Sequence, residues 1–332
     1  GGAVKEFENG TTPAEIAKSI GAGLYKSVCC AKVDGDLCDL RTPLEKDCKV
    51  ELLTFDNVDG QKTFWHTASH VLAQAVKRLY PNAKCAIGPA VDNGFYYDFD
   101  VEKPFSPEDL EKIKAEMKKI VKSGLELERV ELSPEEAEKK LEEMNEPYKV
   151  ELVKEHSDKG EHITFYKQGE FIDLCAGPHL MSVAPIKAIE LTACTGAYWR
   201  GDANNAQLCR VYGVAFPKAS MLEEHLKKLE EAKLRDHNKL GRELEYFTTV
   251  DYVGQGLPIL LPKGARVVQL LQRWVEDVEQ SKGCLLTKTP LLAKRDLYKI
   301  SGHWDHYLDG MFVLGDPHDE EKECFALRPM TC

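Results

Sequence analysis

The sequence predicts a multidomain α+β protein. The chain has 332 residues, which at ~100–200 residues per domain corresponds to about two domains, or three if some are small. Its composition, 43% hydrophobic and 30% charged, is that of ordinary globular proteins and disfavours disordered, collagen-like and disulfide-scaffold classes. Short strand patterns and amphipathic helical patterns both occur along the chain, and no internal repeat appears.

Charge and cysteine content narrow the functional classes. The formal net charge is −11, so a nucleic-acid partner would have to contact local basic regions on an acidic surface. The 11 cysteines are odd in number and irregularly spaced in a chain long enough to fold without disulfides, which predicts a reducing, cytoplasmic environment. No apolar run reaches the ~18 residues of a membrane span, so we expect no membrane partner.

Residues 1–62 have the pattern of a small β-grasp-like module. Thr12-Pro13-Ala14-Glu15 is a capping box with proline at the first helical position, and Gly21 ends the predicted helix. Ile16 and Ile20 form the apolar face of this helix. Strand patterns and a hairpin signal complete the module at residues 29–33, 50–55 and Asp34-Gly35.

Residues 63–217 have a longer α+β pattern. An amphipathic helix is predicted over 64–80, and Asn93-Gly94 forms a turn into an aromatic strand. Capping boxes that begin at Ser106 and Ser133 predict two further helices. The first of these has an apolar stripe formed by Leu110, Ile113, Met117 and Ile120. Further strands are predicted over 163–166, 170–174 and 188–193.

The remainder begins with a charged helix. Residues 218–242 are predicted as one long helix with both signs of charge, which is typical of a solvated connector. A new module follows Phe247 and contains a long amphipathic helix near residues 265–282. Residues 324–332 have a strand pattern without a terminal helix or polar tail, so we expect the chain to be part of a longer protein.

The main candidate site consists of His66 and His70 on a predicted helix and Cys175 and His179 after a strand. Residues at i and i+4 lie on one helical face, so both imidazoles can converge on one point. Gly177-Pro178 disfavours helix and places Cys175 and His179 on a turned loop. Such residues fit either a tetrahedral zinc site or a metal-free hydrolytic pocket that activates water.

A purely structural interpretation of these residues stays open. With 10 histidines in the chain, a pair at one given spacing occurs by chance roughly 0.3 times, and a core histidine held by hydrogen bonds explains either residue alone. Thr67 follows His66 where zinc metalloproteases require glutamate, so that motif is excluded. Cys175 has little structural reason to occupy a Gly-Pro turn, which favours a functional site.

Further residues are candidates for the same pocket. Asp173 and Cys175 point to one side of an extended strand, although a single aspartate at a strand end is more often a turn or ion-pair residue. Tyr96 and Tyr97 point in opposite directions, so at most one of them faces the site. Lys149 would supply a cation, although a solvated surface lysine is the simpler interpretation.

Seven motifs, taken together in chain order, resemble the N-terminal part of bacterial-type threonyl-tRNA synthetases, a family of class II enzymes. Each motif alone is modest, but the ordered set extends along the whole chain and is highly specific. The motifs are His66-Thr-Ala-Ser-His70, Gly88-Pro-Ala-Val-Asp-Asn-Gly-Phe-Tyr-Tyr-Asp98, Asp173-Leu-Cys-Ala-Gly-Pro-His179, Arg235-Asp-His-Asn-Lys-Leu-Gly241, Leu257-Pro-Ile-Leu-Leu-Pro-Lys-Gly264, Ser301-Gly-His-Trp-Asp-His-Tyr307 and Leu327-Arg-Pro-Met-Thr-Cys332.

The resemblance implies four parts and two sites. The parts are a ubiquitin-like TGS domain (1–62), an α+β editing domain (63–217), a connector helix (218–242) and the start of a class II antiparallel-sheet catalytic domain (243–332). The resemblance implies that the editing site hydrolyses mischarged seryl-tRNA. It assigns substrate binding there to Tyr97 and catalysis to His66, His70, Cys175, His179, Asp173 and Lys149. It makes Cys332 one ligand of the zinc ion in the synthetic site.

The family attaches threonine to tRNA-Thr with ATP, so the resemblance implies ATP, Mg²⁺ and zinc as cofactors. It implies tRNA-Thr and threonine as partners, and a homodimer as the assembly. The rest of motif 2, motif 3, the other zinc ligands and the anticodon-binding domain do not occur in this sequence. We therefore expect at most editing hydrolysis from these 332 residues.

The resemblance also suggests why the family would need an editing site. Serine lacks only one methyl group of threonine, which discriminates by ~1–3 kcal/mol, so a second, hydrolytic site is needed. We expect a histidine of near-neutral pKa to deprotonate a water that attacks the ester, while Lys149 stabilises negative charge or orients the ribose. Related alanyl-tRNA editing domains bind zinc through such residues, but we expect a metal-free site as in the threonyl family.

Two other functions stay open. The chain could be a free-standing deacylase that removes serine from tRNA, although such a protein has no use for residues 243–332. It could also be a non-catalytic RNA-binding or regulatory module, which fits the small N-terminal module but not the convergent histidines and cysteine.

Overall fold

The computed structural model describes residue 2 and residues 4–330. The chain forms two compact units, and the boundary between them falls between Leu234 and Arg235. We refer to residues 1–234 as the first unit and to residues 235–332 as the second unit. No helix in the described part of the chain is long and apolar enough to cross a membrane.

The first unit begins with two helices and a three-stranded sheet, which we call the N-terminal module. The predicted capping box opens α1 (Pro13–Ile20): the Thr12 hydroxyl accepts from the Glu15 N–H, and the Glu15 carboxylate accepts from the Thr12 N–H at 2.8 Å. The sheet is antiparallel in the order β2-β1-β3. The other elements are α2 (Ala22–Ser27), β1 (Val28–Val33), β2 (Asp36–Cys38) and β3 (Val50–Thr54).

The buried side of α1 differs from the apolar face read from the sequence. Ala14 and Ala17 face the core of the N-terminal module, whereas Ile20 is 51% exposed and Ile16 only half-buried. The core around these alanines contains Leu40, which is fully buried. Small side chains allow the helix to approach the sheet closely, so alanine takes the place that the larger isoleucines were expected to fill.

Helix α3 (Val58–Leu79) begins before its predicted start at Phe64, so the expected boundary between residues 62 and 63 lies inside a helix. Gly60 in its first turn packs against β3, where an added Cβ would lie 2.0 Å from the carbonyl oxygen of Thr54. An ion pair of 2.6 Å joins Lys32 on β1 to Asp59 on α3. The N-terminal module is therefore packed directly onto the helix that carries two of the candidate histidines.

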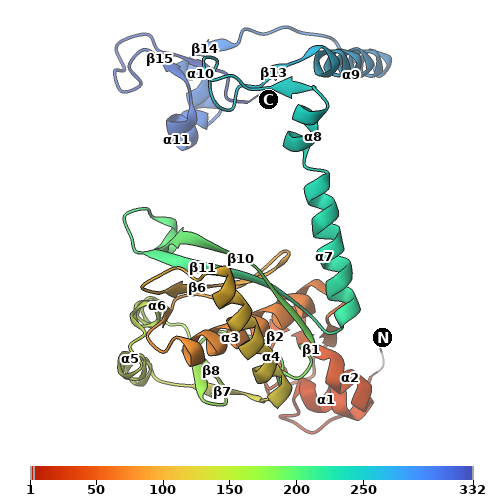
Figure 1. Ribbon diagram of the computed structural model, residues 1–332, viewed down its shortest axis with the longest axis vertical. Helices are drawn as coiled ribbons and strands as arrows, with labels where there is room; N and C mark the ends of the chain where they lie inside the picture. The colour runs from red at the N-terminus through yellow and green to blue at the C-terminus, as the bar shows by residue number, and fades with distance from the viewer. Residues whose placement is uncertain (1, 3, 331–332) are drawn as a thin grey trace. The chain divides into compact units, whose positions relative to one another are not determined.

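A five-stranded antiparallel sheet forms the centre of the first unit. Strands β10, β11, β6 and β4 are neighbours in that order, and β5 pairs with β6. Helices α3 and α4 (Pro107–Ser123) pack against each other and against this sheet (Figure 1). The core includes Phe64, Tyr97 and Phe99. The strands are β4 (Lys84–Cys85), β5 (Ala90–Val91), β6 (Gly94–Asp100), β10 (Ala188–Tyr198) and β11 (Gln207–Phe216).

A second antiparallel sheet, β7-β8-β9, leads into the loop that carries Cys175 and His179. Its side chains share a core with α5 (Pro134–Glu143) and α6 (Pro147–Asp158). The capping boxes predicted at Ser106 and Ser133 are confirmed at the starts of α4 and α5. The strands are β7 (Leu127–Glu131), β8 (Thr164–Gln168) and β9 (Phe171–Leu174).

The helix predicted over residues 218–242 is divided in two. Helix α7 (Ala219–Leu234) ends at the unit boundary, and it contains no buried residue, as expected of a solvated helix. Helix α8 (His237–Glu243) begins anew because the Asp236 side chain accepts a capping hydrogen bond from the Lys239 N–H at 2.9 Å.

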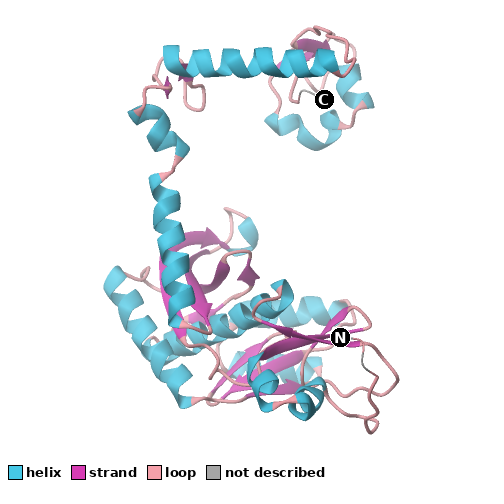
Figure 2. Cartoon of the chain, turned by 90° about the vertical axis from the view of Figure 1, so that its right-hand side faces the viewer, coloured by secondary structure: helices cyan, strands magenta, loops and turns pink. Residues whose placement is uncertain are grey.

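The second unit has two small antiparallel sheets, β12-β13 and β14-β16-β15, and one long helix. That helix is α9 (Pro262–Ser281), the amphipathic helix predicted near residues 265–282 (Figure 2). The described residues therefore confirm a multidomain chain of mixed helices and strands. The other elements are β12 (Phe247–Thr248), β13 (Ile259–Leu260), β14 (Leu292–Lys294), α10 (Arg295–Ile300), α11 (His303–Tyr307), β15 (Val313–Leu314) and β16 (Phe325–Leu327).

Candidate functional site

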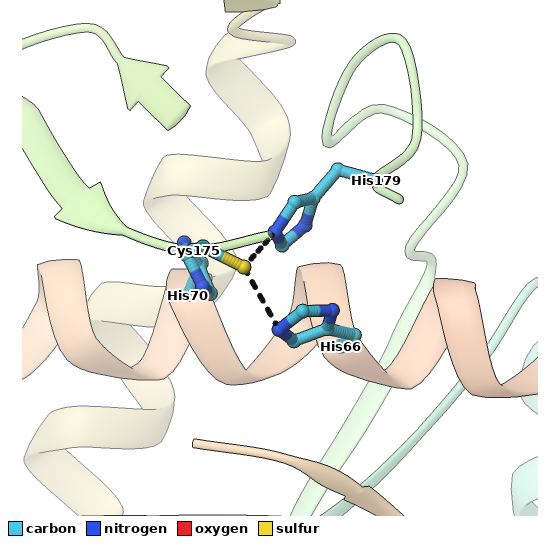
Figure 3. A group of neighbouring side chains, drawn as sticks. All are labelled: His66, His70, Cys175 and His179. Carbon is cyan, nitrogen blue, oxygen red and sulfur yellow. Dashed lines mark hydrogen bonds between the residues drawn. The ribbon is translucent and has the colours of Figure 1, made fainter. Parts of the chain in front are cut away.

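The structure brings His66, His70, Cys175 and His179 into one cluster, which we call the quartet. Figure 3 shows two imidazoles projecting from α3 and the other two side chains entering from the loop after β9. Their ligand atoms, one from each residue, lie within 4.8 Å of one another. Cys175 Sγ is 3.2 Å from Nε2 of His66 and 3.2 Å from Nε2 of His179. The convergence expected from the spacing is present, and the chemical roles remain predictions.

Glycine allows the loop to reach the helix. Gly177 has a φ of 75°, in the left-handed region that glycine adopts without strain. An added Cβ there would lie 2.3 Å from the hydroxyl oxygen of Tyr166, so no larger side chain fits. His66 and His70 are one helical turn apart and project from the same face of α3. Together these local features direct all four side chains of the quartet to one place.

Thr67 fixes the position of the proton on the His179 imidazole. Its hydroxyl donates to the carbonyl oxygen of Thr63 at 3.0 Å, so its oxygen is left to accept. That oxygen accepts from the Leu180 N–H at 3.0 Å and lies 3.2 Å from Nδ1 of His179. Nδ1 therefore carries the proton, and Nε2 presents its lone pair to Cys175.

Burial keeps the three imidazoles of the quartet neutral at neutral pH. It lowers the pKa of His66 to about 4 and that of His70 to about 3, although Asp173 attracts a proton to both. Burial also lowers the pKa of His179 well below its ordinary value, and the two neighbouring histidines add to this effect. The near-neutral pKa that we expected for the base is therefore wrong, because burial outweighs the nearby carboxylate.

The Cys175 thiol is protonated at neutral pH. Burial raises its pKa to about 12, and the Gly177 N–H, which donates to Sγ at 3.3 Å, offsets only part of this shift. A protonated thiol is a poor nucleophile. In the absence of a metal ion, the quartet is therefore suited to holding a water molecule rather than to forming a covalent intermediate on sulfur.

A buried ion pair lies beside the quartet. Lys149 on α6 and Asp173 on β9 are 2.7 Å apart, and each side chain is only 4% exposed. The second carboxylate oxygen of Asp173 accepts from the Tyr97 hydroxyl at 2.6 Å and lies 3.7 Å from Nε2 of His70. Burial opposes both charges, but their mutual attraction prevails, so the pKa of Lys149 is raised and that of Asp173 is lowered.

These contacts show where the other candidate residues, Lys149, Tyr97 and Tyr96, lie relative to the quartet. Lys149 is buried, so the expectation of a solvated surface lysine is wrong; the cause is its ion pair with Asp173. Tyr97 is the one tyrosine of its pair that faces the site, and it is fully buried with its hydroxyl on Asp173. Tyr96 lies on the other side of β6, with the Arg210 guanidinium 3.9 Å from its ring centroid.

The donor set of the quartet fits a zinc ion. Imidazole nitrogen and cysteine sulfur are preferred zinc ligands, and a tetrahedral site separates its ligand atoms by roughly 3.3–3.8 Å. The two separations of 3.2 Å at Cys175 lie close to this range, and Nε2 of His179 offers a lone pair. In the described part of the chain no other group of three or more such side chains is close enough to hold an ion. Cys332, the expected ligand of a second zinc ion, lies outside the described residues.

Sequence reasoning missed the residues that hold the quartet from outside. These residues are Thr67, Tyr166, Asp39 and Arg41. Only Thr67 carried a local signal, because it lies between the two histidines on α3. The others are far from their partners in the sequence, so no spacing rule could have found them.

Comparisons with known proteins agree with the motif set. A family model described as "TGS domain" matches residues 1–54, and one described as "Threonyl and Alanyl tRNA synthetase second additional domain" matches residues 163–212, which include Cys175 and His179. The whole chain is 60% identical over 331 residues to the threonine–tRNA ligase of Clostridium perfringens (strain 13 / Type A). The chain matches the N-terminal half of threonine–tRNA ligases.

Two further threonine–tRNA ligases show how far the match extends. The chain is 59% identical to that of Clostridium botulinum (strain Alaska E43 / Type E3) and 51% identical to that of Acetivibrio thermocellus. Each alignment covers 100% of this chain and 51% of the relative, so the chain spans about half the length of the threonine–tRNA ligases it matches. The resemblance to threonyl-tRNA synthetases drawn from the motifs is confirmed.

Proposed function

We propose that the quartet is an editing site that hydrolyses the ester bond of seryl-tRNA. The observation that carries this proposal is the convergence of three imidazoles and a protonated thiol beside the buried Lys149–Asp173 pair. A deep polar cluster of this kind suits a hydrolytic reaction. The match of the chain to threonine–tRNA ligases supports a mischarged tRNA as the substrate.

In the proposed reaction, a water molecule held by the quartet attacks the carbonyl carbon of the serine ester. An imidazole Nε2 that carries a lone pair, such as that of His179, takes a proton from this water. The bond between the carbonyl carbon and the ribose oxygen then breaks, and the ribose oxygen receives the proton. The products are free serine and tRNA with a restored terminal hydroxyl, so atoms and charges balance.

Lys149 and Asp173 give the site its fixed charges. The Lys149 ammonium lies near the carbonyl oxygen of Leu174, at 3.4 Å, immediately before Cys175. A cation at this place would favour the negative charge that develops on the ester oxygen, or would orient the ribose. Tyr97, which we expected to bind substrate, would support this through its hydrogen bond to Asp173.

The quartet would hold zinc, if it is bound, through His66, His70, Cys175 and His179. Bound zinc would supply Lewis-acid chemistry to the ester and to a water molecule, for which it would need an open coordination position besides these four side chains. The proton transfers assigned to this chain need only its own residues. The expected metal-free site thus stays a prediction, and metal analysis of the purified chain decides it.

We propose that the longer protein containing this chain is a threonine–tRNA ligase, acting in the cytoplasm as a homodimer on tRNA-Thr, threonine and ATP with Mg²⁺. Residues 243–332 would begin its class II catalytic domain, and Cys332 would be one ligand of its zinc ion. We retain the four expected parts but move the first boundary to the segment before α3, because α3 crosses residue 62. The match to proteins of about twice this length favours the ligase over a free-standing deacylase.

The test is hydrolysis of seryl-tRNA-Thr by residues 1–332, followed as release of labelled serine, with threonyl-tRNA-Thr as the competing substrate. We expect serine to be released faster than threonine, and His70→Ala to slow serine release by about 10²-fold or more, because it removes one of the side chains proposed to hold the attacking water. No hydrolysis, or hydrolysis unchanged by His70→Ala, would contradict the proposal. Zinc bound at one per chain, and lost in Cys175→Ala, would overturn the metal-free prediction alone.

A further inference from the structure

Two residues of the N-terminal module bind the backbone of the loop that carries His179. Asp39 and Arg41 follow β2 directly in the sequence, outside the motifs that carry the family resemblance. The Arg41 guanidinium donates to three carbonyl oxygens of the first unit outside its own module: Leu127 at 3.0 Å, His179 at 3.3 Å and Leu180 at 2.7 Å. Two of these three carbonyls belong to the loop that carries the quartet residue His179.

Asp39 binds the same loop at the other backbone group of His179, the N–H. One carboxylate oxygen accepts from the His179 N–H at 3.2 Å and from the Tyr166 hydroxyl at 2.8 Å. The other accepts from the Arg41 side chain at 3.0 Å and from the Arg41 N–H at 2.9 Å. Asp39 is 8% exposed, so this network is shielded from water. Both backbone groups of His179 are therefore bound to the N-terminal module.

Tyr166 extends the network to the imidazole itself. Its ring centroid is 4.4 Å from that of His179. Its hydroxyl packs against Gly177, where a side chain on residue 177 would collide with it. Met181, in the same loop, packs against the core of the N-terminal module. The loop is therefore contacted at three places: the backbone of His179, the ring of His179 and the side chain of Met181.

This arrangement exceeds what is needed to attach the module. A charged pair in a shielded place is a weak source of stability, because removing both charges from water offsets most of their attraction. Directional hydrogen bonds between charged groups and a loop backbone instead restrict where that loop can lie. The module is already attached to α3 by close backbone packing at Gly60 and by the ion pair of Lys32 with Asp59.

We propose that Asp39 and Arg41 are positioning residues of the hydrolytic site, so that the N-terminal module supplies part of the supporting shell of the quartet. They act through His179 and Tyr166, and they hold Nε2 of His179 at its place opposite Cys175. This inference rests on the proposed editing function. It assigns the N-terminal module a role in hydrolysis that neither its family match nor the sequence motifs provide.

The test compares Arg41→Met, Arg41→Lys and Asp39→Asn in residues 1–332 under saturating and subsaturating seryl-tRNA. Misplacing a reacting group by about 1 Å costs on the order of 10²-fold in rate, so we expect kcat to fall by roughly 10- to 100-fold in Arg41→Met and Asp39→Asn. We expect KM to stay within about threefold, because neither residue contacts substrate. Arg41→Lys keeps the charge but replaces the guanidinium fork by a single nitrogen that reaches fewer of the three carbonyls, so it should recover part of the loss.

Lys32→Met is the matched control. It also removes a cation of the N-terminal module that bonds to a neighbouring element, but its partner Asp59 is at the start of α3 and away from the loop. We expect its kcat to equal that of the unsubstituted chain. If Arg41→Met fails to fold, judged by circular dichroism, Tyr166→Phe serves instead. It removes only the hydroxyl that donates to Asp39, and it should also lower kcat.

The outcomes separate the two proposals. If folded Arg41→Met and Asp39→Asn, or Tyr166→Phe in their place, keep kcat within about twofold of the unsubstituted chain, the positioning role is wrong while the editing function stands. An equal loss of kcat in Lys32→Met would also overturn it, because docking of the module in general would then be the cause. If the unsubstituted chain does not hydrolyse seryl-tRNA, the proposed function fails, and this inference fails with it.

Discussion

The two units use their apolar residues differently. In the first unit, α3 buries nearly every side chain between Thr63 and Val76 and carries two histidines of the quartet into that core. In the second unit, α9 has only Gly264 buried and exposes Leu271 by 55% and Trp274 by 64%. Both helices are long and amphipathic in sequence, so amphipathic pattern alone does not tell a covered face from an uncovered one.

Depth of burial also separates the chemistry of the two units. The imidazoles and the thiol of the first unit have shifted pKa values because the surrounding core excludes water. Histidines of the second unit such as His306 are exposed, and its ion pairs, such as Lys294 with Glu323, lie at the surface. Burial in a core that excludes water is therefore what shifts the pKa values of the histidines in the quartet.

The largest effect is expected from the buried ion pair. Lys149→Met leaves the Asp173 carboxylate buried without its partner, which costs about 3–5 kcal/mol of unfolding free energy. Lys154→Met is the control on the same helix, since Lys154 is 58% exposed and 4.0 Å from Glu138. It should change the free energy by less than about 1 kcal/mol. Urea unfolding, read from hydrogen exchange of α3 peptides, measures both, and equal losses would contradict the account.

The next effect compares one apolar side chain on a helix of each unit. Met117 on α4 is fully buried, so Met117→Ala should lower the unfolding free energy of the first unit by about 2–5 kcal/mol. Leu271 on α9 is mostly exposed, so Leu271→Ala should change that of the second unit by no more than about 0.5 kcal/mol. The same urea series, read from peptides of each unit, checks this. A loss at Leu271 as large as at Met117 would show that α9 is covered in solution.

Acid should weaken the first unit through its buried histidines. Burial holds the pKa of His70 at about 3 in the folded chain, below its ordinary value of 6.5, so between these pH values the unfolded chain binds more protons. Stability is therefore lost as pH falls below about 6.5, and by pH 4 His70 accounts for up to about 3 kcal/mol of that loss. Urea unfolding at pH 7, 5.5 and 4 measures it.

The control for this pH effect is a pair of substitutions. His70→Gln should reduce the dependence of the first unit's stability on pH, and His66 and His179 account for the part that remains. His306→Gln, at an exposed position of the second unit, should leave this dependence unchanged. A first unit that keeps its full stability from pH 7 to pH 4 would mean that its histidines are not buried in the neutral form.

Local signals predicted local structure well. The capping boxes at Ser106 and Ser133 placed the starts of two helices, because a cap and its partner are only three residues apart. The quartet could also be anticipated, since one pair follows from helical spacing and the other from a Gly-Pro turn. The division of the connector at Asp236 could have been read from its capping side chain, but the charge pattern favoured one helix.

Contacts between distant segments could not be predicted from the residues themselves. Lys149 is an ordinary lysine until α6 brings it to Asp173, 24 positions later, and Arg41 meets His179 across 138 positions. Burial decides the state of such groups, and burial depends on the packing of whole elements. The same reason explains why the covered face of α1 carries Ala14 and Ala17 instead of the isoleucines.

The central claim is that hydrolysis depends on the quartet in the first unit. The most direct measurement is the rate constant for seryl-tRNA hydrolysis by residues 1–332, compared among the unsubstituted chain, His179→Ala and His306→Ala. We predict a loss of about 10²-fold or more in His179→Ala and no change in His306→Ala, because His179 presents a buried lone pair beside Cys175 whereas His306 is exposed in the second unit. Equal rates in all three proteins would contradict the account.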